Sequence, residues 1–123
     1  MNPPLKDTIA LFWTSHHLQA FQQAWDGGEY DTNWTTRIYQ QGIEFKHWKT
    51  EAAVDSDVQK LFNVARSGCN MTLNREYQKL HDKWSDRRND EACDYLANAW
   101  DIISTVQIKL ARRWGVYIEW QVD

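Results

Sequence analysis

The hydrophobic pattern changes its period at Gly115, and this change constrains the fold more than any other feature of the sequence. Before the glycine, apolar residues recur at helical spacing over 96–114. After it, apolar and polar residues alternate over 116–122, which is typical of a strand with one buried face. A lone strand leaves its backbone N–H and C=O groups unpaired, so the segment 116–122 requires a partner.

The segment 34–48 is the partner that the sequence favours. It is rich in β-branched and aromatic residues, and Gly42 would weaken a helix there by ~1 kcal/mol. We therefore predict a small antiparallel sheet built from three strands, at 34–40, 43–48 and 116–122. If 34–48 is helical instead, the tail must pair with another chain, and the alternative fold is an all-α bundle.

Four helices are expected to pack on this sheet. Their apolar residues recur at helical spacing over 5–25, 57–67, 73–84 and 90–114. Glycines follow the first, second and fourth of these segments, and Asn89 or Asp90 can cap the start of the last. No repeat or linker divides the 123 residues, so we expect a single domain, 1–123, that is predominantly helical α+β.

The composition argues against several classes of protein. A net charge of −3 is unusual for a dedicated nucleic-acid binder, so direct nucleic-acid binding is not expected. No apolar run approaches the ~20 residues that span a bilayer, and no signal peptide is recognisable. Cys69 and Cys93 match no metal or redox spacing. We expect a cytoplasmic protein with no metal, no cofactor and no membrane partner.

The eight tryptophans divide into two groups. Five occupy apolar faces of predicted elements: Trp13, Trp84, Trp100, Trp114 and Trp120. The other three lie in or beside the acidic N-terminal half, and one small core does not bury eight tryptophans fully. Exposed Trp and Tyr are enriched in binding hot spots, and carboxylates nearby suit a basic protein partner. The predicted partner-binding surface consists of Trp25, Asp26, Glu29, Tyr30, Asp31, Trp34, Tyr39, Glu44 and Trp48.

A second acidic feature has a four-residue repeat. It comprises Asp82, Asp86, Asp90 and Asp94. On one continuous helix these residues would form a row with ~6 Å steps, close to the spacing of phosphates on nucleic acid. The alternative is an ordinary solvated face, since Lys79, Lys83 and Arg87 lie alongside.

The segment from Arg75 to His81, with the sequence REYQKLH, resembles the R-x(4–6)-H motif of the HEPN ribonucleases, which are small helical domains. The resemblance implies that His81 serves as a base and Arg75 as a charge stabiliser in phosphodiester cleavage. It covers seven residues, and Glu76 replaces the polar residue that usually follows the arginine. Residues six apart on a helix are about 120° from alignment, so this chemistry would need a bend or a dimer partner.

The leading functional hypothesis is a small, acidic, non-enzymatic protein-binding module. It is similar in type to phage-encoded anti-CRISPR and other anti-defence inhibitors and to immunity proteins. The expected partner is a basic protein such as a nuclease or CRISPR effector, inhibited by occlusion of a functional site. The alternatives are a nucleic-acid-binding accessory subunit and a HEPN-like ribonuclease. The sequence does not set the oligomeric state.

Overall fold

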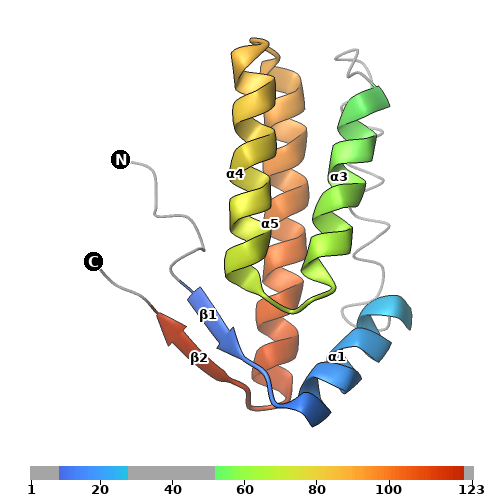
Figure 1. Ribbon diagram of the computed structural model, residues 1–123, viewed down its shortest axis with the longest axis vertical. Helices are drawn as coiled ribbons and strands as arrows, with labels where there is room; N and C mark the ends of the chain where they lie inside the picture. Colours follow the sequence, from blue (N-terminus) through green and yellow to red (C-terminus); the bar gives the residue numbers. More distant parts are fainter. Residues whose placement is uncertain (1–8, 28–51, 121–123) are drawn as a thin grey trace.

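The computed structural model describes residues 9–27 and 52–120, which form a predominantly helical α+β fold (Figure 1). The predicted fold class is therefore confirmed. In chain order the elements are β1 (Ile9–Phe12), α1 (Ser15–Gly27), α3 (Ala52–Ala65), α4 (Asn70–Asp86), α5 (Asp90–Arg113) and β2 (Tyr117–Trp120).

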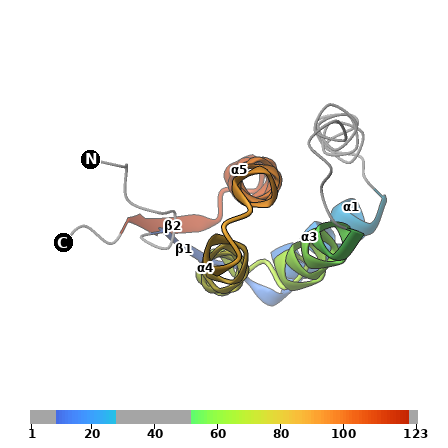
Figure 2. The same cartoon turned by 90° about the horizontal axis from the view of Figure 1, so that it is seen from above.

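The helices α3, α4 and α5 run side by side and enclose the core, while α1 packs across one end of α3 (Figures 1 and 2). The apolar stripes read from the sequence supply this core: Leu61, Leu73, Leu96 and Ile103 are completely buried. Burial of each such side chain contributes about 1.5–3 kcal/mol, which holds the helices together more than helix propensity does.

The start of α5 follows the prediction closely. The side chain of Asn89 accepts a 3.1 Å hydrogen bond from the backbone N–H of Ala92, which caps the helix. The helix α5 ends at Arg113, and Gly115 adopts a left-handed φ of 67° before the strand begins. The other two long helices start earlier than predicted, α3 at Ala52 and α4 at Asn70.

The sheet contains the predicted C-terminal strand, but its partner is not the segment 34–48. The strand β2 pairs antiparallel with β1, with Leu11 opposite Ile118 and Phe12 opposite Tyr117. The prediction that only 34–48 could pair with the tail is therefore wrong. The proposed strands at 34–40 and 43–48 lie outside the described residues.

The partner was missed because residues 9–12 were assigned to a helix over 5–25. The helix α1 begins only at Ser15, and the hydroxyl of Thr14 caps it by accepting a 3.1 Å hydrogen bond from the backbone N–H of His17. Periodicity alone cannot assign a short apolar run such as 9–12 to a strand or a helix. In the structure, residues 9–12 form a strand because they pair with β2.

A chain of buried amide side chains links α3, α4 and α5. The Nδ2 of Asn70 donates to Ser104 Oγ and to Gln107 Oε1, both at 2.9 Å. Gln107 Nε2 donates to the carbonyl of Ala65 at 2.9 Å, and Asn74 Nδ2 donates to Asn70 Oδ1 at 3.2 Å. Because these groups find partners inside the core, their burial does not leave polar atoms unsatisfied.

Candidate functional site

The largest exposed apolar side chains of the described residues lie together on the two-stranded sheet. Phe12 is 51% exposed and Tyr117 is 65% exposed. They are directly opposite each other in the register, and their ring centroids are 5.5 Å apart. Two aromatic rings that touch each other and water form a contiguous apolar patch, which is typical of contact surfaces.

The pleat of the sheet explains why this pair is exposed. Successive side chains of a strand point to opposite faces, so Phe12 and Tyr117 share one face with Glu119, which is also exposed. Ile9, on the other face, is 1% exposed, and β1 packs against α4. We call the face that carries Phe12, Tyr117 and Glu119 the outer face of the β1–β2 ribbon. No described element covers it.

The sequence contained only a weak signal for this face. Phe12 falls within the helix predicted over 5–25, and Tyr117 falls at a polar position of the alternation predicted over 116–122. A tyrosine on the outward side of a half-buried strand could have been recognised as an exposed aromatic. Without β1 as the partner of β2, however, nothing placed a phenylalanine beside it.

Only Trp25 and Asp26 of the predicted partner-binding surface are in the part of the chain that the structure describes. Trp25 is 7% exposed and belongs to the core, so its predicted exposure is wrong. Its ring stacks on Phe21 at 5.6 Å and lies 6.4 Å from Phe62. The reason is its place on the buried side of α1, four residues after Phe21. The rest of the set lies outside the described ranges: Glu29, Tyr30, Asp31, Trp34, Tyr39, Glu44 and Trp48.

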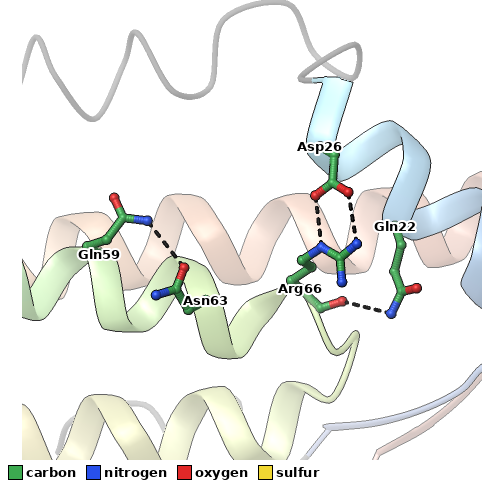
Figure 3. Close-up of polar contacts among 5 residues, drawn as sticks. All are labelled: Gln22, Asp26, Gln59, Asn63 and Arg66. Atoms are coloured by element: carbon green, nitrogen blue, oxygen red, sulfur yellow. Dashed lines mark hydrogen bonds and ion pairs between the residues drawn. The ribbon is translucent and has the colours of Figure 1, made fainter.

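Asp26 is exposed, but it already has a basic partner. Both of its carboxylate oxygens accept hydrogen bonds from Arg66, from Nε and from Nη2, at 2.9 Å (Figure 3). The hydrogen bonds from Arg66 lower the pKa of Asp26. They outweigh desolvation, which acts to raise it, and the charge of Arg66 lowers it further. Gln22, one turn earlier on α1, donates to the carbonyl of Arg66 (Figure 3). The ion pair of Asp26 with Arg66 therefore links α1 to the end of α3.

The acidic row does not lie on one helix. The helix α4 ends at Asp86 and α5 begins at Asp90, and between them Arg88 adopts a left-handed φ of 55°. The four aspartates therefore do not form one continuous row, because Asn89 caps a new helix. Asp82 and Asp94, on the two separate helices, are exposed like the other two aspartates.

Carboxylates from both helices nevertheless surround Cys93. Burial raises the pKa of the Cys93 thiol, and the negative charges of Asp90, Asp94 and Asp82 raise it further. The thiol donates a 3.7 Å hydrogen bond to the carbonyl of His81. A thiol whose pKa is raised stays protonated and is a poor nucleophile at neutral pH. This cluster therefore favours a structural role for Cys93.

The residues that resemble the HEPN motif lie on one uninterrupted helix. Arg75 and His81 both belong to α4, and a continuous helix holds side chains six residues apart about 120° from alignment. His81 packs on the ring of Tyr77 at 5.7 Å, and its Nδ1 lies 3.9 Å from Asp82. The bend that would bring Arg75 and His81 together is absent from α4.

The most buried ionised group in the described residues is Asp57, whose side chain is 2% exposed. Its Oδ2 accepts hydrogen bonds from Lys83 Nζ at 2.7 Å and from Trp84 Nε1 at 2.8 Å, and Oδ1 lies 3.3 Å from Lys60 Nζ. Desolvation acts to raise the pKa of Asp57, but these donors and the charge of Lys83 outweigh it, and the pKa lies below its usual value. With partners on both oxygens, Asp57 joins α3 to α4.

Within residues 9–27 and 52–120, no group of three or more His, Cys, Asp or Glu side chains could hold a metal ion. In the same part of the chain, no helix is both long and apolar enough to cross a membrane. A comparison with known protein families, curated proteins and solved structures finds no match to this chain.

Proposed function

We propose that the chain is a non-enzymatic protein-binding module whose contact surface includes the outer face of the β1–β2 ribbon. The observation that supports this most is the exposed pair of Phe12 and Tyr117. Aromatic side chains carry much of the binding energy in protein interfaces, because they bury a large area while losing little rotamer entropy.

The chemistry of this face suggests what a partner would present. Phe12 and Tyr117 suit an apolar or aromatic side chain that can stack on them, and Glu119 on the same face suits a lysine or arginine at the rim. Glu119 is the observation on this face that supports our proposal of a basic partner. Because the rings and the carboxylate lie at different places on this face, they would fix the orientation of a bound partner as well as attract it.

We retain the narrower proposal that this partner handles nucleic acid, as a nuclease or CRISPR effector does, and is inhibited by occlusion. Its support is the acidic composition of residues 1–58, eight acidic against four basic. Most of the residues assigned to that acidic surface lie outside the described ranges. Asp26 contributes little to it, since Arg66 neutralises its charge.

The test is affinity capture from cells of the native host with matched variants. Phe12→Ser combined with Tyr117→Ser removes both rings of the outer face. Gln19→Ser combined with Gln23→Ser removes two exposed side chains of α1 and serves as the control. We expect the ring variant to lose at least one captured protein that the control and the unaltered chain retain. If all three capture the same proteins in the same amounts, the outer face is not the contact surface.

A further inference from the structure

The outer face of the ribbon carries one charge beside its two rings. Glu119 follows Tyr117 by two residues on β2, so it lies about 7 Å along the strand on the same face. The residue directly across from Glu119 is Ala10, and Phe12 is its diagonal neighbour. Because the side chain of Ala10 is a single methyl group, the exposed carboxylate of Glu119 can be approached from that side.

The carboxylate of Glu119 has no cation of its own in the described part of the chain. The ion pairs there involve other carboxylates, and Glu119 takes part in no hydrogen bond or ion pair. A partner that covered the rings with apolar side chains alone would bury this carboxylate unpaired, which is costly. Phosphates of nucleic acids or lipids would meet a like charge. This face therefore favours a cationic side chain of a protein.

One cation can serve a ring and a carboxylate together, and α4 provides an example. Lys83 Nζ lies 2.7 Å from Asp57 Oδ2 and 5.1 Å from the centre of the Trp84 ring. Asp57 and Trp84 are buried, however, whereas the rings of the outer face are exposed to water. In water an ammonium stays strongly hydrated. A guanidinium is less hydrated and planar, so it can stack on a ring while its N–H groups bind a carboxylate.

We propose that the outer face of the β1–β2 ribbon binds one arginine side chain of the partner protein. The guanidinium lies over the aromatic pair of Phe12 and Tyr117, and its N–H groups donate to the carboxylate of Glu119. The spacing of about 7 Å along the strand suits both contacts, since a cation interacts with a ring within about 6 Å of its centre. The assignment of an arginine rests on the proposed function and names the side chain that this contact surface recognises.

The first test uses random peptides displayed on phage and selected on the immobilised full chain. Peptides that also bind the double variant Phe12→Ser, Tyr117→Ser are discarded, so the remaining peptides depend on the two rings. We expect these peptides to be enriched in arginine, more than in lysine, beside an apolar or aromatic residue. Ring-dependent peptides without an enriched arginine, or the absence of any ring-dependent peptide, would overturn the inference.

A double-mutant cycle with one selected peptide then tests the contact with Glu119, with Kd measured by fluorescence anisotropy. Glu119→Gln should raise Kd about two- to fivefold, as expected for an exposed ion pair. Replacing the arginine of the peptide by citrulline, its uncharged isostere, should raise Kd by at least as much. Glu119→Gln should have no further effect on the citrulline peptide, whereas additive effects would mean that the arginine does not contact Glu119.

Asp86→Asn is the matched control, since it neutralises an exposed carboxylate at the end of α4 and should leave Kd unchanged. Far-ultraviolet circular dichroism of each variant checks that the helices are retained. Capture from host cells separates the two proposals. If capture depends on Phe12 and Tyr117 but the selected peptides lack arginine, the arginine site is wrong and the proposed function stands. If capture does not depend on the two rings, the proposed function fails whatever the peptides show.

Discussion

The carboxylate of Asp57, on α3, accepts a 2.8 Å hydrogen bond from the indole Nε1 of Trp84, on α4, and Trp84 is completely buried. The same oxygen accepts a hydrogen bond from Lys83, which also lies 5.1 Å from the centre of the Trp84 ring. One carboxylate thus satisfies the indole of the largest fully buried side chain and binds a cation from the same helix. Because the pKa of Asp57 is lowered in the folded state, we expect the stability of the helical core to depend on pH.

Asp57→Ala should destabilise the protein by about 2–4 kcal/mol, because it leaves the Trp84 indole without an acceptor and Lys83 without its counter-ion. The folded state lowers the pKa of Asp57 from its ordinary value of 3.8. The stabilisation from this ionisation is therefore present above about pH 4, and it is lost as the pH falls through the folded pKa. Urea titrations between about pH 7 and pH 3 should show the difference between the variant and the unaltered chain shrinking in acid.

Asp86→Ala, which removes an exposed carboxylate at the end of α4, is the control and should change stability by less than about 0.5 kcal/mol. A constant difference between Asp57→Ala and the unaltered chain at every pH would contradict the role assigned to the ionised carboxylate.

Gly68 and Gly115 provide a matched pair of tests for the packing of Trp13. Both adopt left-handed φ angles, 79° and 67°. A Cβ at Gly68 would lie 2.8 Å from Trp13 Nε1, whereas a Cβ at Gly115 meets nothing within 4 Å. Gly115→Ala should cost only the backbone strain, about 1–2 kcal/mol. Gly68→Ala should cost about 1–3 kcal/mol more, because the indole that donates to the Gly68 carbonyl must move. Equal melting temperatures for the two variants would refute the close packing.

The buried amide chain is tested by Asn70→Leu. The substitution removes the donor to Ser104 and Gln107 and leaves polar atoms unsatisfied inside the core. We expect a loss of about 2–4 kcal/mol in the free energy of unfolding, measured by urea denaturation. Asn63→Leu is the control, since Asn63 is exposed and bonds only to Gln59 on the same helix in the described structure (Figure 3). A similar loss in both variants would mean that the hydrogen bonds among the buried amide side chains do not contribute specifically to the free energy of unfolding.

The helices could be predicted from the sequence because their signals are local. In α5, apolar residues recur over 24 residues, Asn89 caps the start and arginines occupy the last turn, so several independent signals agree. The strand β2 was also readable, since a strict alternation follows Gly115. Its partner was not, because pairing joins residues about a hundred positions apart and β1 has only four residues.

The candidate site was less predictable than the fold for the same reason. The exposure of Phe12 depends on which strand pairs with β2 and which face that pairing turns outward. Trp25 shows the opposite error, since a tryptophan near the end of a helix was taken for a contact residue although Phe21 and Phe62 enclose it. Composition indicates that some aromatics are exposed, but only tertiary contacts decide which ones.

The most direct test of the proposed contact surface is site-specific photo-crosslinking in the native host. A photoreactive phenylalanine derivative replaces Tyr117 in one variant and Gln78, an exposed residue of α4, in the control. We expect a covalent adduct with another protein from position 117, no such adduct from position 78, and loss of the first adduct when Phe12→Ser is added. No adduct from position 117, or equal adducts from both positions, would contradict the claim that the outer face of the ribbon binds a partner.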